Sequence, residues 1–311
     1  MSSLGVLVMA YGTPGGAEEL EAYYTHIRHG RAPTPELLAE LRGRYEAIGG
    51  RSPLLAITGE QLAGLSRALA DAGHPRVPIA LGMKHSAPFI EDGIAELAAA
   101  GADWILGVVL APHYSSMSVG EYSARALEAA ARQSDPPHVS VTRSWHLDPH
   151  YLDYLTEALS ETLAELPGER KGREHVLFTA HSLPTRVLGS GDPYPDQLQQ
   201  TAEAVAARLD LARWSVAWQS AGRTPEPWIG PDVLEAMGTL AGAGVEAVVV
   251  CPAGFVADHL EILYDLDIEA AQRARELGIG FARTPMPNAD PRIAAALSDA
   301  VLAQLPVGPA G

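Results

Sequence analysis

The sequence predicts an α/β protein with two similar, doubly wound, Rossmann-like parallel-sheet domains. Short β-branched apolar runs alternate with long helical patterns along the whole chain. The apolar fraction of 47% is typical of a globular protein, and 311 residues suffice for two domains. The halves also carry related strand-and-turn segments, of which 6–14 and 176–184 form the clearest pair. Two such sheets facing each other would enclose an interdomain cleft.

Each element follows from its local pattern. Runs rich in Val, Ile, Leu and Ala predict strands at 5–11, 77–83, 104–111, 138–144, 175–180, 214–219, 245–251 and 278–282. Helical periodicity predicts helices at 17–27, 35–48, 61–72, 90–100, 119–132, 151–166, 195–211, 231–241, 258–277 and 292–305. We place the first domain at 1–144 and the second at 145–311, and the last helix is in a position to pack back onto the first domain.

Composition excludes several classes of function. A net charge of −16 opposes nucleic acid and anionic lipid as main partners, because both would be repelled. One cysteine makes no internal disulfide, CxxC redox pair or thiolate zinc site. The apolar segment 4–10 lacks the basic flank of a signal peptide, and no apolar run approaches the ~20 residues of a spanning helix. We therefore expect a cytoplasmic protein with no integral membrane segment.

Known phosphate and nucleophile motifs are missing after the predicted strands. No GxGxxG, GxxxxGK[ST] or GxSxG sequence follows any of them. In open parallel sheets, ligands bind outside the carboxyl ends of the strands. The polar residues at those ends are Tyr11, His85, His113, His181 and Gln219, together with the turn at 255–258.

An acidic pattern opens the predicted helix at 258–277. On an α-helix, Asp258, Glu261, Asp265 and Glu269 would fall within an arc of about 80°, and the first three have no Lys or Arg at i+4 to neutralise them. A solvated acidic face is one interpretation, and an N-cap role for Asp258 is another. A line of carboxylates that enters a cleft is also suited to attracting a divalent cation.

Two residues at strand ends are candidates for chemistry. His181 is interpreted either as a structural histidine or as a group that ligates iron and accepts a proton near neutral pH. Tyr11 holds the corresponding position in the first half, where a tyrosine that packs and hydrogen-bonds is the simpler interpretation.

The segment 28–51 is basic, with five arginines against three glutamates. Its arginines, Ser52 and backbone N–H groups at a cleft edge would suit the carboxylate tails of an organic substrate. The alternative is an ordinary surface loop. Taken together, a cation path, a base or ligand and a carboxylate-binding rim suggest that a metal is delivered into an anionic organic chelator.

These motifs resemble the ferrochelatase family, and within it the coproporphyrin ferrochelatases of monoderm bacteria. The resemblance covers essentially the whole chain, and its specific segments are 7–14, 24–28, 44–50, 110–113, 180–184, 191–197, 218–220 and 254–261. It implies two Rossmann-like domains with the porphyrin in the cleft between them. It also implies insertion of ferrous iron into coproporphyrin III to give coproheme, a step of haem biosynthesis.

The resemblance assigns metal-insertion residues position by position. His181 matches the family's catalytic histidine, and Glu261 matches the carboxylate opposite it in the same iron site. Which of the two removes pyrrole protons and which binds entering iron stays open. Asp265 and Glu269 continue from this pair to an outer divalent-cation site that would take Mg²⁺.

Other positions match residues around the substrate. Tyr11 would lie on the opposite face of the macrocycle and could ligate the inserted iron, and His85 would line the same cleft. The resemblance places near the propionates Arg28, Ser52, Gln61, Ser116 and Ser118. It also counts Arg44 as substrate-binding and places it near the outer cation site of Asp265 and Glu269. His29 stands where a close relative type has arginine, so one propionate contact should differ.

Ferrous iron is then a substrate, and we expect no tightly bound cofactor. Some ferrochelatases hold an iron–sulfur cluster through several cysteines, which Cys251 alone cannot do. The resemblance further suggests a monomer that contacts neighbouring haem-pathway enzymes transiently.

Three alternatives remain. The first is a ferrochelatase that acts on protoporphyrin IX. The second is a cobalt or nickel chelatase that acts on sirohydrochlorin, for which His85, His113 and His181 would be available. The third is a non-catalytic porphyrin or haem carrier, in which Tyr11 and His181 would ligate haem but the acidic pattern would have no use.

Overall fold

A computed structural model describes residues 3–305 and contains two four-stranded parallel sheets. The first has the order β2-β1-β3-β4, and the second has the equivalent order β6-β5-β7-β8. The strands of the first sheet are β1 (Leu4–Ala10), β2 (Ile79–Met83), β3 (Trp104–Val109) and β4 (His138–Val141). Those of the second are β5 (Glu174–His181), β6 (Trp214–Gln219), β7 (Ala247–Cys251) and β8 (Gly280–Arg283). The predicted fold class and all eight strands are confirmed.

Helices connect the strands in both sheets. Up to β4 these are α1 (Leu20–Ile27), α2 (Pro35–Ala47), α3 (Leu54–Asp71), α4 (Ile90–Ala99) and α5 (Val119–Ala131). The remaining ones are α6 (Pro149–Ala164), α7 (Arg186–Gly189), α8 (Tyr194–Leu209), α9 (Val233–Gly242), α10 (Leu260–Leu263), α11 (Ala271–Leu277) and α12 (Pro291–Leu302). Short turns η1 (Ala17–Glu19) and η2 (Gly168–Arg170) and the π-helical turn η3 (Asp265–Ala270) complete the set. The domain limits at 144 and 145 stay a prediction, and residues 1–2 and 306–311 lie outside the described part.

Alternation along the central strands directs side chains to opposite faces of each sheet. Leu7 and Met9 of β1 enter a core under α4 and α5, whereas Val6 and Val8 face the other way. That second core continues through α3, α6, α8 and α12 to Val176 and other residues of the second sheet. A third core lies under α9, η3 and α11. The largest apolar cluster is therefore shared between the two sheets.

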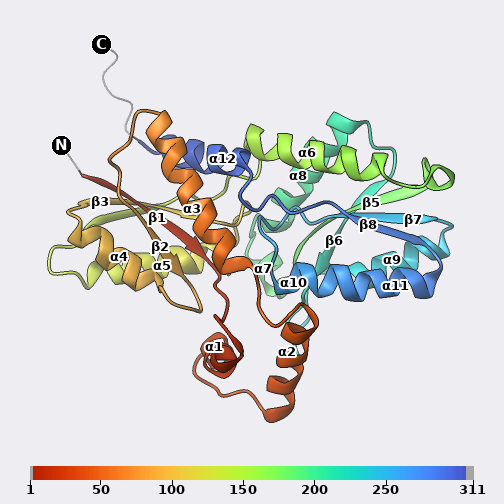
Figure 1. The fold of residues 1–311 in the computed structure, drawn as a ribbon, viewed down its shortest axis with the longest axis horizontal. Coiled ribbons are helices and arrows are strands. Elements are labelled where there is room, and N and C mark those ends of the chain that lie inside the picture. The colour runs from red at the N-terminus through yellow and green to blue at the C-terminus, as the bar shows by residue number, and fades with distance from the viewer. Residues whose placement is uncertain (1–2, 306–311) are drawn as a thin grey trace.

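The last helix crosses back to the first half of the chain. Figure 1 shows α12 beside α3 and α6, at the junction between the two sheets. The Gln304 side chain just after α12 contacts Thr142 beyond β4, and the Thr142 hydroxyl donates to the Ala300 carbonyl at 3.3 Å. By contrast, α1 and α2 form an arm that projects away from both sheets (Figure 1).

Two element predictions were wrong in detail. Helix α3 begins at Leu54, seven residues before the predicted 61, because the Ser52 hydroxyl accepts from the Leu54 N–H and the Thr58 hydroxyl donates to the Leu54 carbonyl. The predicted helix at 258–277 begins at Leu260 and changes pitch at η3. Helix α7 was not predicted, since one short turn leaves no periodic pattern.

Buried polar residues join the two halves. The side-chain amide of Gln61 on α3 donates to the backbone carbonyls of Val256 at 2.9 Å and Asn288 at 2.8 Å. His113, after β3, is buried and pairs through Nε2 with the Thr201 hydroxyl of α8 at 2.9 Å. Each contact ties a residue of the first half to an element of the second.

Replacing Gln61 with Leu should lower the free energy of unfolding by about 2–3 kcal/mol, because two buried carbonyls lose their donor. Urea denaturation measures the change. The matched control is Gln199→Leu, which removes only an exposed contact to Glu203 and should cost no more than about 0.5 kcal/mol. Equal losses in the two variants would contradict a joining role for Gln61.

His113 should make the fold sensitive to acid. Burial lowers the pKa of His113 to about 3, so below pH 6.5 the unfolded chain takes up a proton there that the folded chain refuses. Stability is therefore lost as the pH falls, by about 2 kcal/mol between pH 7 and pH 5 from this group.

The His113→Gln variant keeps a donor toward Thr201 and should lose less stability over that pH range than the wild type. Denaturant titrations at pH 7 and pH 5 measure the difference. The exposed His138→Gln is the control, since it removes an imidazole without removing a buried one. An unchanged pH dependence in His113→Gln would show that the imidazole titrates freely in the folded state.

Candidate active site

Parallel pairing brings the polar strand ends of the second sheet together. His181 is the last residue of β5 and pairs in register with Gln219, the last residue of β6. Glu261 lies in the first turn of α10, which follows β7 after a turn. The carboxyl edge of this sheet thus gathers the residues that the sequence analysis assigned to metal insertion.

His181 and Glu261 face each other directly. The imidazole Nε2 of His181 lies 3.6 Å from a carboxylate oxygen of Glu261, and His259 approaches the other oxygen at 3.9 Å. The Nδ1 atom of His181 is at hydrogen-bond distance from the Ser182 carbonyl. A carbonyl only accepts, so Nδ1 carries a hydrogen and the lone pair of neutral His181 is on Nε2.

The charges of this pair reinforce each other. Burial by itself lowers the pKa of His181, but the Glu261 carboxylate outweighs it and the pKa is raised. Burial by itself raises the pKa of Glu261, but His181, His259 and Arg44 bring it down to about 2. Glu261 is therefore an anion that favours the protonated form of its histidine partner.

Two neighbours of this pair were not assigned from the sequence. The Tyr194 hydroxyl donates to the His181 backbone carbonyl at 3.0 Å. His259 caps the first turn of α10 by accepting from the Ile262 N–H at 3.3 Å. Tyr194 lies in segment 191–197 and His259 lies in segment 254–261, both of which carry the resemblance to ferrochelatases. That resemblance was therefore the signal that could have identified these two residues.

The prediction of four unneutralised carboxylates on one helix face was wrong. Asp258 lies before the helix, where it accepts from Asn288 at 2.7 Å and pairs with Arg283 at 3.2 Å. Asp265 pairs with Arg44 of α2. These partners are distant in sequence, so the i+4 rule could not find them, and the change of pitch at η3 breaks the 100° spacing on which the predicted arc rested.

The outer carboxylates differ from each other. Asp265 is buried and bound by Arg44 and by the Ser220 hydroxyl, and burial raises its pKa to about 7 against the effect of Arg44. Glu269, one π-turn further on, is exposed. Among residues 3–305, the structure contains no group of three or more His, Cys, Asp or Glu side chains arranged to hold a metal ion.

Tyr11 lies at the carboxyl end of β1 and is 43% exposed. Its ring is 4.6 Å from that of His85, whose Nδ1 is 3.0 Å from Nδ1 of His26. Although Tyr11 is partly exposed, desolvation of its hydroxyl by the surrounding protein, followed by the charge of Glu261, raises its pKa.

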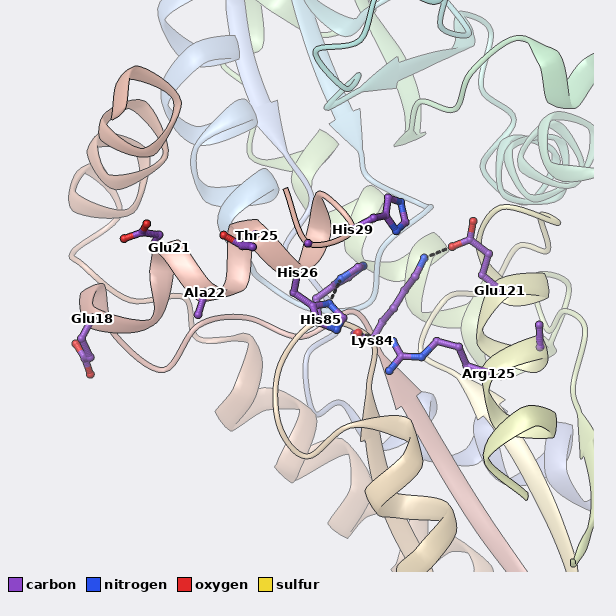
Figure 2. Close-up of a pocket in the computed structure, with 12 residues that line it drawn as sticks. Glu18, Glu21, Ala22, Thr25, His26, His29, Lys84, His85, Glu121 and Arg125 are labelled. Atoms are coloured by element: carbon purple, nitrogen blue, oxygen red, sulfur yellow. Dashed lines mark hydrogen bonds and ion pairs between the residues drawn. The ribbon is translucent and has the colours of Figure 1, made fainter. Parts of the chain in front are cut away.

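A cavity of about 1040 Å³ is lined in part by His85, against which Tyr11 packs. Figure 2 shows Glu18, Glu21 and Thr25 on one side of it and Glu121 and Arg125 on the other, with His26, His85 and Lys84 between them. Its lining is formed by Glu18, Glu21, Ala22, Thr25, His26, His29, Gly30, Lys84, His85, Glu121, Ala124 and Arg125. The cations of this cavity were missed because Lys84 and Arg125 lie far from the arginine-rich segment 28–51.

The predicted propionate contacts have varied surroundings. Arg28 donates to the Arg31 carbonyl at 3.3 Å, and Arg44 stacks over the Tyr264 ring at 4.5 Å. Ser116 donates to Asp192 at 2.7 Å, while Ser118 precedes α5. Ser52 and Gln61 make the contacts described for α3. None of these six residues lines the cavity described above, and their roles toward a substrate stay predictions.

Comparison with known proteins gives this geometry a context. The family model described as "Ferrochelatase" matches residues 3–305. The chain is 46% identical over 304 residues to the coproporphyrin III ferrochelatase of Anoxybacillus flavithermus, covering 97% of this chain and 96% of the relative. It is 43% identical to the coproporphyrin III ferrochelatase of Bacillus subtilis, covering 97% and 98%.

Solved structures support the fold. The sirohydrochlorin chelatase SirB from Bacillus subtilis subspecies spizizenii, in complex with cobalt, aligns with a TM-score of 0.60 at 11% identity, over 96% of this chain and 94% of that one. DR2241 of Deinococcus radiodurans, described as similar to chelatases, aligns with a TM-score of 0.55 at 14% identity, over 96% and 55%. The structural likeness shows a chelatase-like fold, and the sequence matches show that the chain belongs to the ferrochelatase family.

Proposed function

We propose that the protein inserts ferrous iron into coproporphyrin III to form coproheme. The observation that carries the proposal is the His181–Glu261 pair, whose atoms lie 3.6 Å apart at the carboxyl edge of the second sheet. Tyr11 follows the corresponding strand β1 of the first sheet and packs against His85, which lines a large cavity. Relatives that share 43–46% of their residues with this chain carry the same activity in their names.

Metal insertion exchanges one ferrous ion for two pyrrole N–H protons, so the site must receive protons. His181 suits this role because its Nδ1–H is held by the Ser182 carbonyl and Nε2 is left as the acceptor. Glu261 stays ionised and stabilises the imidazolium that forms. We therefore assign proton transfer to His181 Nε2 and the electrostatic role to Glu261.

Ferrous iron enters as a substrate, and the carboxylates of Glu261 and Glu269 are oxygen ligands on its way. A Mg²⁺ ion shared by Asp265 and Glu269 would have to displace Arg44 and Ser220 from Asp265. The present arrangement does not fit such an ion, so the mechanism has no step through it.

The oligomeric state, the transient contacts with pathway enzymes and the cytoplasmic location stay predictions. Within the described residues, no helix has the length and apolar character to span a membrane.

Coproporphyrin III has two more propionates than protoporphyrin IX and needs more cationic donors around it. Lys84 and Arg125 at the cavity supply two, and Arg28 in the arm beside it supplies a third. Lys84 is paired with Glu121 and Arg125 with Glu91, so each cation is already held in place. With Glu18, Glu21 and Glu121 also in the lining, the cavity has no excess of cations, so the preference for the more highly charged porphyrin rests on the named relatives.

The sirohydrochlorin alternative loses one of its three candidate histidines. His113 is 1% exposed and bonded to Thr201, so it is not available to a metal in the cavity. A carrier would use Tyr11 to ligate haem, but it would have no function for the ionised Glu261 beside His181.

Comparative turnover tests the substrate. Purified protein and ferrous iron should convert coproporphyrin III at least ten-fold faster, in kcat/KM, than protoporphyrin IX, because the extra propionates meet Lys84 and Arg125. Anaerobic visible spectroscopy follows the product. Equal rates would remove coproporphyrin selectivity, conversion of sirohydrochlorin with cobalt would support the second alternative, and binding without turnover would support a carrier.

Substitutions at the pair test the chemistry. His181→Ala should abolish detectable insertion, and Glu261→Gln should lower kcat by about 10²-fold while porphyrin affinity changes little, because the carboxylate acts on the transition state. Porphyrin fluorescence quenching gives the affinity. The exposed His150→Ala is a control that removes a distant imidazole. Normal insertion by His181→Ala, or equal losses of kcat and affinity in Glu261→Gln, would contradict these roles.

A further inference from the structure

Gln219 is buried at the junction of the three segments that build the candidate active site. It ends β6 and is 1% exposed, and its backbone carbonyl accepts from the Ser182 N–H at 2.7 Å. The catalytic assignments above do not use its side chain. A buried amide needs partners for both of its ends, and these partners reveal what it holds.

One end of the amide meets the helix that carries Glu261. Nε2 of Gln219 donates to the backbone carbonyl of Glu261 at 3.2 Å. In this helix Tyr264 donates to Leu260, four residues back, whereas Glu269 donates to Tyr264, five residues back. The Glu261 carbonyl lies where the pitch changes, and there the Gln219 amide serves as its donor.

The other end meets the strand that carries His181. Oε1 of Gln219 accepts from the Thr179 hydroxyl at 2.8 Å, and Thr179 lies two residues before His181 on β5. The amide has one orientation, because only its NH₂ end can donate to a carbonyl and only its oxygen can accept from a hydroxyl that donates. Thr179 is fully buried, so this bond is shielded from water.

We propose that Gln219 is a positioning residue that holds the Glu261 carboxylate opposite His181, by bridging the Thr179 hydroxyl and the Glu261 backbone carbonyl. The inference deepens the proposed function and rests on it for its kinetic consequence. Without the amide, the first turn of α10 is no longer hydrogen-bonded to β5 through Gln219, and the distance between His181 Nε2 and Glu261 Oε1 is no longer fixed. A shift of about 1 Å in a catalytic group lowers rates by up to about 10²-fold.

The test uses Gln219→Met, which keeps the length of the side chain and removes both polar ends. We expect kcat for iron insertion into coproporphyrin III to fall about 10- to 100-fold, while the porphyrin Kd from fluorescence quenching stays within about two-fold. Thr179→Val should show a smaller loss of kcat in the same direction, and Thr179→Ser, which keeps the hydroxyl, should restore wild-type kcat. Thr162→Val is the matched control, since it removes a buried hydroxyl that donates to Ala158 at 2.8 Å on α6.

A crystal structure of Gln219→Met gives a readout that does not depend on activity. We expect the separation of His181 Nε2 and Glu261 Oε1 to increase from 3.6 Å by about 1 Å. An unchanged separation, or kcat within two-fold of an active wild type, would overturn the inference. If the wild type is inactive but the variant still shows the longer distance between His181 and Glu261, the proposed function is refuted and the positioning role is supported.

Discussion

The active-site geometry depends on the apolar layer that the two sheets share. Val6 and Val8 of β1 and Val176 and Phe178 of β5 belong to one buried cluster, with α3, α6, α8 and α12 between the sheets. Because this layer is close-packed, the relative placement of the two carboxyl edges is set by side-chain volumes and not by a flexible linker. Buried hydrogen bonds, such as the one from the Gln61 side-chain amide to the Val256 carbonyl, then fix the position of α3 against the second half of the chain.

The fold was predictable because its signal is local and repeated. Each strand is a short apolar run between helical patterns, and every strand assignment depends only on that alternation. Failures occurred where a few residues or a tertiary contact decide the outcome. Helix α3 begins directly after Pro53, where Ser52 accepts from the Leu54 N–H, and α7 is one turn long. Neither feature changes the hydrophobic period, so periodicity could not reveal them.

The proximity of His181 and Glu261 was predictable from the sequence, but the charges around them were not. The segment at 180–184 and the one at 254–261 pointed to His181 and Glu261, and the structure brings these two side chains together. The acidic pattern, however, predicted a free line of carboxylates. Arg44 is 221 positions from Asp265, and Arg283 comes from β8 to reach Asp258. Long-range ion pairs of this kind leave no trace in local spacing, so the sequence overstated the available negative charge.

The two equivalent sheets carry opposite kinds of polar group at their carboxyl ends. Tyr11 after β1 stacks on His85, whose pKa is lowered to about 3 by burial and by Lys84, so that face presents uncharged rings. His181 at the end of β5 faces an ionised carboxylate instead. In the proposed reaction, protons that leave the ring and a cation that approaches it would both be stabilised beside His181 and Glu261, so two sheets of equivalent topology would contribute different chemistry to one reaction.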